Sequence, residues 1–386
     1  MAEEEATRLQ FNPHVWALPP YNAGMNVDDA RALSGRDEVA RLASNENPEG
    51  CSPKVTEVLR EMVWEPWRYA DPACRALRAA LARHLRVDAD HIVVGNGSEE
   101  LIAAVSRAVL QPGDQVVTVA PSFGLHEIEP LACGASVVKV PMSDRLTFDV
   151  PALQAALTAK PALCFLSTPW NPVGPALSEA QLARLVASAS PETLLVMDEA
   201  YFEYADEQGP DVLQALRASG LPYVALRTFS KAYGLAGLRV GYAICSHRQI
   251  ARAMANAKTP FNVNAAAQAA AQAALADQAW MRASVQRLRA ERERVRAQLG
   301  QQGWRVAPSQ TNFLFVDTRQ NSVDVAERLL RAHGIIVKAW REPGYEQFLR
   351  VTIGMPPENN RFLDAMRALA TPSAMPELPA ATGEAA

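Results

Sequence analysis

The sequence predicts an α/β protein in which a large domain, built on a mostly parallel seven-stranded sheet covered by helices, precedes a smaller α+β domain. Seven short runs rich in Val, Ile and Leu alternate with helical stretches between His91 and Cys245. The runs are continuously apolar, which fits strands buried on both faces of a parallel sheet. A stretch rich in Ala, Gln and Arg without Pro extends from Asn264 to about Gln302, and a length of 386 residues leaves room for a second domain.

The expected elements follow in order along the chain. The seven strands of the large sheet are expected in the runs HIVVGNG, QVVTVAP, SVVKVP, ALCFLST, TLLVMDEAY, YVALRTFS and RVGYAIC. In the smaller domain we expect strands in NFLFVDT, GIIVK and FLRVTIG, and helices over SVDVAERLLRAHG and ENNRFLDAMRAL. We therefore divide the chain into an N-terminal arm (1–45), a large domain (46–275), a small domain (276–372) and a disordered tail (373–386).

The composition is that of an ordinary globular protein. Apolar residues make up 49% and charged residues 21%, and 38 Lys and Arg against 42 Asp and Glu give a formal charge of −4. Neither nucleic acid nor a membrane surface is indicated as a partner. The five cysteines form no CxxC pair, which predicts reduced thiols and no metal site. The acidic start, MAEEEATRLQ, lacks the features of a secretory signal, and no window reaches the roughly 20 apolar residues of a membrane span, so a cytoplasmic location is expected.

Polar clusters follow four of the apolar runs. GNGSEE follows HIVV, STPWNPVG follows ALCFL, DEAY follows LLVM, and TFSKAYGLAGLR follows YVAL. Ligands of an open parallel sheet bind beyond the carboxyl ends of its strands. We therefore expect all four clusters at one rim of the sheet.

The first cluster, GNGSEELI, indicates a strand, a glycine turn and a helix start. Free backbone N–H groups in the first helical turn suit a phosphate, although an ordinary capped helix is the simpler interpretation of this motif alone. Neither GxGxxG nor GxxxxGK[ST] occurs, so dinucleotide and P-loop nucleotide binding are not indicated.

Asp198 and Glu199 directly follow four apolar residues. A carboxylate at the end of a buried strand requires a cationic partner, because burying an unpaired charge is costly. The candidates are a metal, an arginine and the protonated ring nitrogen of a bound heterocycle, but DEAYFEY has no further ligand at metal spacing. An ion pair with a purely structural role is an equally weighted interpretation of this pair of carboxylates.

Lys231 lies between a strand and a glycine-containing loop, next to Ser230 and eight positions before Arg239. A lysine at such a place is usually a solvated loop residue, yet a partly desolvated strand end also suits a lysine that must be neutral to form a Schiff base. One lysine, one strand-end aspartate, a helix-start anion site, a serine and an arginine are together the groups that hold pyridoxal phosphate.

Three further side chains fit the same cofactor. Asn171 in NPVG and Tyr201 are placed to hydrogen-bond the phenolic oxygen of the ring, and the rigid Asn-Pro pair fixes the loop of the asparagine. Phe123 in PSFG is suited to stacking on the ring face, although a core phenylalanine is the default interpretation.

The ordered set of motifs resembles fold type I aminotransferases and, within them, the histidinol-phosphate aminotransferase family. The resemblance covers about 340 residues and is carried by SNENP, Tyr69 with Asp71, GNGSEE, PSFGLHE, NPVG, DEAYFEY, RTFSKAYGLAGLRVGY and FLRVTIG. It implies pyridoxal 5'-phosphate as cofactor, a small-molecule amino donor with a 2-oxo acid acceptor, and a homodimer with shared active sites.

The resemblance also implies roles for single residues. Lys231 is implied as the Schiff-base lysine and proton shuttle, Asp198 as the partner of the pyridine nitrogen, and Asn171 with Tyr201 as partners of the phenolic oxygen. The cofactor phosphate is assigned to Ser98, Glu99 through its backbone N–H, Ser230, Arg239 and, from the partner subunit, Tyr69. The substrate is assigned to Arg350, Lys338, Tyr21 and Asn47, with Asn262 as a further candidate.

Two departures from the family pattern concern the substrate. NPVG stands where the family has NP[NT]G, and Lys338 in GIIVK stands where the family often has arginine. Lysine is a point charge without the planar fork that binds phosphate through two hydrogen bonds. An aromatic amino acid aminotransferase and a decarboxylase of a phosphorylated amino acid therefore remain alternatives. A non-catalytic binding module is disfavoured, because Lys231 and Asp198 are both present.

Overall fold

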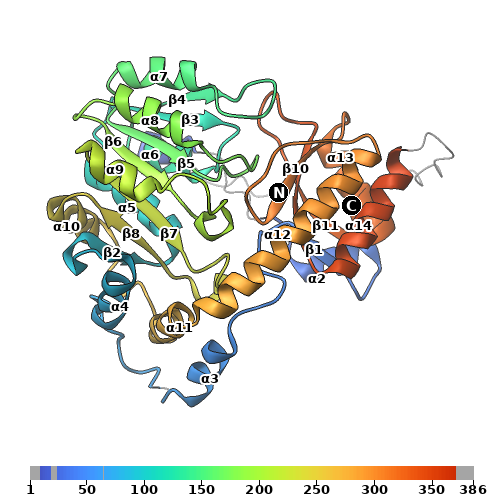
Figure 1. The fold of residues 1–386 in the computed structure, drawn as a ribbon, viewed down its shortest axis with the longest axis horizontal. Helices are drawn as coiled ribbons and strands as arrows, with labels where there is room; N and C mark the ends of the chain where they lie inside the picture. Colours follow the sequence, from blue (N-terminus) through green and yellow to red (C-terminus); the bar gives the residue numbers. More distant parts are fainter. Residues whose placement is uncertain (1–8, 19–23, 64, 371–386) are drawn as a thin grey trace.

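The computed structural model describes residues 9–18, 24–63 and 65–370. Two α/β units lie side by side in Figure 1, and the long helix α12 (Gln278–Gln301) runs from one to the other. Among the described residues, no helix has both the length and the apolar character needed to cross a membrane.

The large unit contains the predicted seven-stranded sheet, in the order β2-β8-β7-β6-β5-β3-β4. β8 runs in the opposite direction to the other strands and pairs antiparallel with β2 and β7, while the remaining pairs are parallel, so the predicted mostly parallel sheet is confirmed. The strands are β2 (Ile92–Gly95), β3 (Gln115–Ala120), β4 (Ser136–Pro141), β5 (Leu163–Ser167), β6 (Leu194–Asp198), β7 (Tyr223–Thr228) and β8 (Gly241–Cys245).

Helices cover both faces of this sheet. Every residue of β5 to β8 is buried, as the continuous apolar runs require. One face packs against α5 (Gly97–Val109), α6 (Leu125–Ala132) and α10 (Arg248–Ala257). The other packs against α7 (Val150–Thr158), α8 (Glu179–Ser188) and α9 (Val212–Ser219). Below the sheet in Figure 1 lie α3 (Pro53–Glu61), α4 (Arg75–Leu85) and α11 (Ala265–Leu275).

The small unit is a five-stranded sheet in the order β1-β11-β12-β10-β9. Its strands are β1 (Ala40–Leu42), β9 (Arg305–Val306), β10 (Phe313–Asp317), β11 (Ile335–Ala339) and β12 (Phe348–Thr352), and its helices are α2 (Val27–Ser34), α13 (Ser322–His333) and α14 (Pro356–Ala370). The segment that we expected to form an N-terminal arm thus contributes α2 and β1, and β1 pairs in parallel with β11. A strand of three residues is too short to show a period of two in the sequence.

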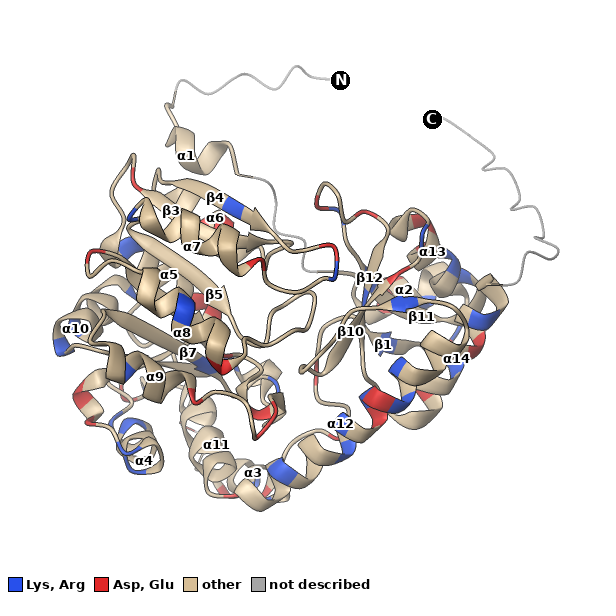
Figure 2. Ribbon diagram, turned by 45° about the horizontal axis from the view of Figure 1, so that its top comes forward, with Lys and Arg blue, Asp and Glu red and all other residues tan. Residues whose placement is uncertain are grey.

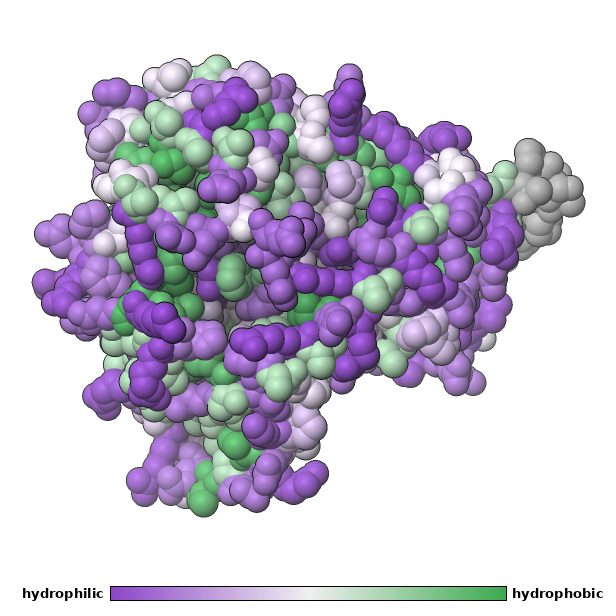
Figure 3. Space-filling view, in the orientation of Figure 1, coloured by the Kyte–Doolittle hydropathy of each residue, from purple (hydrophilic) through white to green (hydrophobic). Residues whose placement is uncertain are grey.

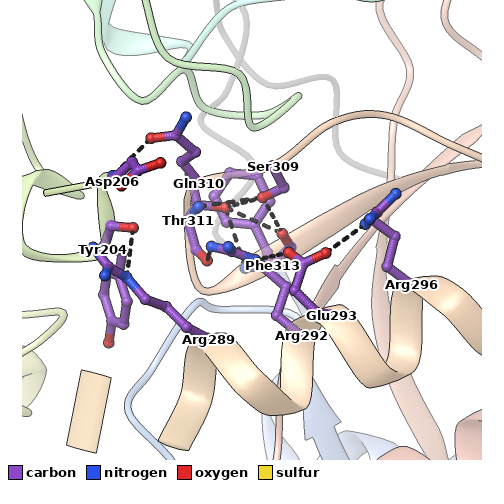
Figure 4. Close-up of polar contacts among 10 residues, drawn as sticks. All are labelled: Tyr204, Asp206, Arg289, Arg292, Glu293, Arg296, Ser309, Gln310, Thr311 and Phe313. Carbon is purple, nitrogen blue, oxygen red and sulfur yellow. Dashed lines mark hydrogen bonds and ion pairs between the residues drawn. The ribbon is translucent and has the colours of Figure 1, made fainter. Parts of the chain in front are cut away.

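The helix α12 ties the two units together. Basic and acidic residues are interspersed along this helix in Figure 2. On the molecular face shown in Figure 3, hydrophilic residues predominate. Figure 4 shows Arg289 pointing to the loop after β6, where its Nε donates to the Tyr204 carbonyl at 3.2 Å. Arg292 points to the other unit and donates to the Thr311 carbonyl at 2.9 Å. The position of the small sheet against the strand ends of the large sheet is thereby fixed.

Candidate active site

A cavity of about 630 Å³ lies at the carboxyl edge of the large sheet and is also lined by residues of the small unit. Its walls include residues that follow β2, β5, β6 and β7, which are the four polar clusters expected at one rim. The opposite wall comes from β11, β12 and the segment after β1. The cavity therefore combines the strand ends of one domain with the sheet of the other.

Asp198 ends β6 and is buried. Its Oδ2 accepts a hydrogen bond from Nε2 of His126 at 3.0 Å, and its Oδ1 accepts from the backbone N–H of Ala200 at 3.1 Å. The His126 ring is fully buried on α6 and stacks on Phe165, with 5.0 Å between the ring centroids. The imidazole thus holds the carboxylate at one orientation.

Our reading of the sequence did not assign His126 to the site. The histidine lies in PSFGLHE, 72 residues before its partner, and no local pattern connects the two. A histidine on an otherwise apolar helix face was the only available signal, and that signal is weak because most such histidines are core residues.

Lys231 follows β7 and reaches the cavity, where its Nζ donates to the Ser44 carbonyl at 3.2 Å. Burial lowers the pKa of its amine to about 8, and the positive charges of Arg350 and Arg239 act in the same direction. Near neutral pH the neutral form of this amine is still the minor one, but it is far more populated than at the ordinary lysine pKa, and the neutral form is what a nucleophilic lysine requires.

The start of α5 and the loop after β7 form an anion-binding end of the cavity. Ser98 and Glu99 lie in the first turn of α5, and Ser230 and Arg239 face them from the loop. Gly97 has a φ of +77°, and a Cβ at this position would lie 2.7 Å from Nη2 of Arg239. The positive φ favours glycine, and a side chain here would have to displace the guanidinium from beside the helix start, where backbone N–H groups favour anions.

Tyr201 is buried, and its hydroxyl accepts a hydrogen bond from Nδ2 of Asn45 at 2.8 Å. Asn45 is in turn held by Thr352, whose hydroxyl donates to its Oδ1 at 2.9 Å. Asn45 and Thr352 had not been assigned from the sequence. Phe123 lines the cavity and meets the His126 ring edge to face, 5.6 Å between centroids.

Two cations face the cavity from the small sheet. Arg350 on β12 is buried, and its Nη1 and Nη2 donate to Oδ1 of Asn171 at 2.8 Å and to the Ala43 carbonyl at 2.7 Å. Lys338 on β11 is the direct strand partner of Arg350. Burial, followed by the positive charges of Arg350 and Arg341, lowers the pKa of Lys338 to about 8.

Three residues assigned from the sequence lie outside the lining of this cavity. Tyr69 is 83% exposed and stacks on Phe261. Asn47 is buried, and its Nδ2 donates to the Ala232 carbonyl and the Ser284 hydroxyl, both at 3.1 Å. Asn262 donates to Glu100 instead. Tyr21 lies outside the described residues.

The cavity fits pyridoxal 5'-phosphate. Asp198, Lys231 and the start of α5 bring a carboxylate, a partly neutral amine and a phosphate-binding helix start to its walls, which are the groups that the ring nitrogen, the aldehyde and the phosphate of the cofactor need. Gly97 supplies the space beside Arg239 that a phosphate would share. Among the described residues, no group of three or more His, Cys, Asp or Glu side chains is arranged to hold a metal ion.

The fold and this site define an enzyme of PLP fold type I. Residues 37–365 match the family model of class I and II aminotransferases. The chain belongs to this family and is a pyridoxal phosphate-dependent aminotransferase.

Two similar curated relatives are both named histidinol-phosphate aminotransferases. The chain is 46% identical to histidinol-phosphate aminotransferase 3 of Rhizobium meliloti over 91% of this chain and 95% of that protein. It is 44% identical to histidinol-phosphate aminotransferase 1 of Mesorhizobium japonicum over 91% of this chain and 95% of that protein. A similar solved structure is histidinol-phosphate aminotransferase from Sinorhizobium meliloti in complex with pyridoxal-5'-phosphate, with a TM-score of 0.86, 29% identity, and coverage of 95% of this chain and 99% of that chain.

Proposed function

We propose that this aminotransferase exchanges an amino group between histidinol phosphate and 2-oxoglutarate, giving imidazole acetol phosphate and glutamate, in histidine biosynthesis. The relatives that share this activity match almost the whole chain. The observation that carries the proposal is the adjacent pair of Arg350 and Lys338 on the small-sheet wall of the cavity. Two neighbouring cations suit a dianionic phosphate better than a single carboxylate.

The cofactor, when bound, supplies an electron sink for the carbanion at the substrate Cα. With the cofactor bound, Asp198 would keep the ring nitrogen protonated, because its carboxylate is held at 3.0 Å by His126 and faces the cavity. Lys231 Nζ would accept the proton from the substrate Cα and hold it until it is returned to the reacting pair, a role for which its lowered pKa is suited. Asn171 and Tyr201 orient the ring through its phenolic oxygen.

We further propose that the active enzyme is a homodimer in which Tyr69 reaches the cofactor phosphate of the partner subunit. Tyr69 and Phe261, which is 44% exposed, form a stacked and exposed aromatic pair, and Trp67 two positions before Tyr69 is 73% exposed. Large exposed aromatic patches mark interaction surfaces. Mixing and refolding Tyr69→Ala with Lys231→Ala should restore part of the activity, because one of the two hybrid sites is intact, whereas a fully active monomer in sedimentation would contradict the proposal.

The substrate is tested by kcat/KM for histidinol phosphate, histidinol and phenylalanine, each paired with 2-oxoglutarate. We expect histidinol phosphate to be preferred, and we expect Lys338→Met to reduce its advantage over histidinol. Better turnover of phenylalanine would replace the proposal with an aromatic aminotransferase, and release of CO2 from a phosphorylated amino acid would replace it with a decarboxylase.

A further inference from the structure

The small-unit wall of the cavity carries a third cation, Arg341, which the resemblance did not assign. Arg341 lies just after β11 and lines the cavity together with Lys338 and Arg350. Its guanidinium is close enough to Lys338 for its charge to lower the pKa of that amine, after the effects of burial and Arg350. Among the described residues, Arg341 has no hydrogen-bond or ion-pair partner, and its side chain is exposed.

The residues on either side of Arg341 are anchored by hydrogen bonds. The Trp340 N–H donates to the Phe348 carbonyl at 3.0 Å, and the Ser322 hydroxyl donates to the Trp340 carbonyl at 2.9 Å. On the other side, the carboxylate of Glu342 accepts from the backbone N–H of Ser122, in the large unit, at 3.0 Å. The attachment point of the Arg341 side chain is therefore fixed at the mouth of the cavity, while its guanidinium keeps all five N–H donors for a ligand.

The two carboxylates on the Lys139 side of the cavity share one ammonium group, so this trio keeps only one net negative charge against the three cations of the small-unit wall. Glu342 and Glu127 both bind Nζ of Lys139, at 3.2 Å and 3.1 Å. With Arg350, Lys338 and Arg341 on the opposite side, the substrate end keeps an excess of positive charge. Such an excess is unfavourable until an anion enters. The pKa of Lys338 is lowered mainly by burial, and the charges of Arg350 and Arg341 add to that effect.

Because Arg350 already makes two hydrogen bonds within the protein, a bound phosphate would need a further hydrogen-bond donor. Its two terminal nitrogens each already donate one hydrogen bond, to Asn171 and to the Ala43 carbonyl. Lys338 offers a point charge and lacks the planar fork of arginine. A phosphate group presents three oxygens, and a guanidinium binds two of them at once.

We propose that Arg341 is a specificity-determining residue that binds the phosphate group of the amino donor and supplies the planar fork that Lys338 lacks. This inference rests on the proposed function. It predicts that Arg341 acts in the half-reaction with the phosphorylated donor and not in the half-reaction with glutamate, whose α-carboxylate is served by Arg350.

The test compares the two half-reactions of the holoenzyme, followed separately by the visible absorbance of the bound cofactor. Arg341→Met should raise the half-saturating concentration of histidinol phosphate by about tenfold or more, the loss expected for a hydrogen bond to a charged group. The limiting rate and the glutamate half-reaction should stay within about twofold, and Arg341→Lys should recover part of the loss because it keeps the charge. Arg331→Met is the matched control, since Arg331 pairs with Glu327 on α13, and this pair lies outside the cavity.

Unchanged saturation by histidinol phosphate in Arg341→Met would overturn the inference, and so would an equal loss in both half-reactions. The preference of the wild-type enzyme for histidinol phosphate over histidinol distinguishes a failure of this inference from a failure of the proposed function. A wild-type enzyme that does not prefer histidinol phosphate over histidinol refutes the proposed substrate, whereas a wild type that prefers it while Arg341→Met behaves identically refutes only the role of Arg341.

Discussion

The hydrogen bond between His126 and Asp198 offers the sharpest test of the site. Replacing His126 with Phe keeps an aromatic ring beside Phe165 but removes the donor that lies 3.0 Å from Oδ2 of Asp198. Nδ1 of His126 has no partner among the described residues, so the bond to Asp198 is the polar contact that this substitution removes. Any loss of activity therefore reports on the orientation of one carboxylate.

The size of the effect follows from the burial of both groups. Asp198 is 4% exposed and His126 is 0% exposed, so water does not replace the missing donor. A hydrogen bond to a charged group contributes about 1.5–3 kcal/mol. If this energy is needed in the transition state, kcat/KM falls by about 10- to 150-fold, since each 1.4 kcal/mol is a factor of ten.

The assay is kcat/KM for histidinol phosphate with 2-oxoglutarate, together with the visible absorbance that reports bound cofactor. His126→Gln should recover part of the loss, because its amide nitrogen reaches the position of the imidazole Nε2. His91→Phe is the control, since His91 also makes one ring hydrogen bond, to the Cys245 carbonyl, away from the cavity. A His126→Phe enzyme with kcat/KM within twofold of wild type, or an equal loss in His91→Phe, would refute the reasoning.

Three further predictions concern the same cavity. Gly97→Ala should weaken cofactor binding in titrations of the apoenzyme, because its Cβ would lie 2.7 Å from Arg239, whereas Gly113→Ala, also at positive φ but in open space, should leave it unchanged. The rate at which apoenzyme captures pyridoxal phosphate should rise with pH to a midpoint near 8, because the neutral amine of Lys231 is the reactive form and its pKa is lowered to about 8; a midpoint near 10.5 would contradict this. The pKa of Lys338 is about 8 in the folded chain and 10.5 in the unfolded chain, so between these pH values the folded chain binds fewer protons. The free energy of unfolding therefore increases as the pH rises through this window, and below it the charged amine opposes folding. Lys338→Met should therefore raise the Tm of the apoenzyme at pH 7, and by less as the pH approaches 10.

The sequence by itself determined the fold class and the rim of the site. Strands such as β5 and β6 are continuous apolar runs, and their burial on both faces follows from that pattern alone. Because parallel strands present their carboxyl ends at one edge, the residues that follow the runs converge, and Asp198 and Lys231 were placed together by this argument. The helical character of the stretch from Asn264 to about Gln302 could also be predicted, since Ala, Gln and Arg favour helices.

The tertiary structure alone decided which distant residues complete the site. His126 meets Asp198 across 72 residues, and Asn45 meets Thr352 across 307. It also decided that β1 joins the small sheet, that Asn47 turns to Ala232 and Ser284, and that Arg341 shares a cavity with Lys338. Hydrophobic periodicity and strand-end rules describe how one segment is exposed to water and to its immediate neighbours. The contacts named above depend on how separate segments pack and on the register of their strands, and the local pattern of a single segment does not specify either.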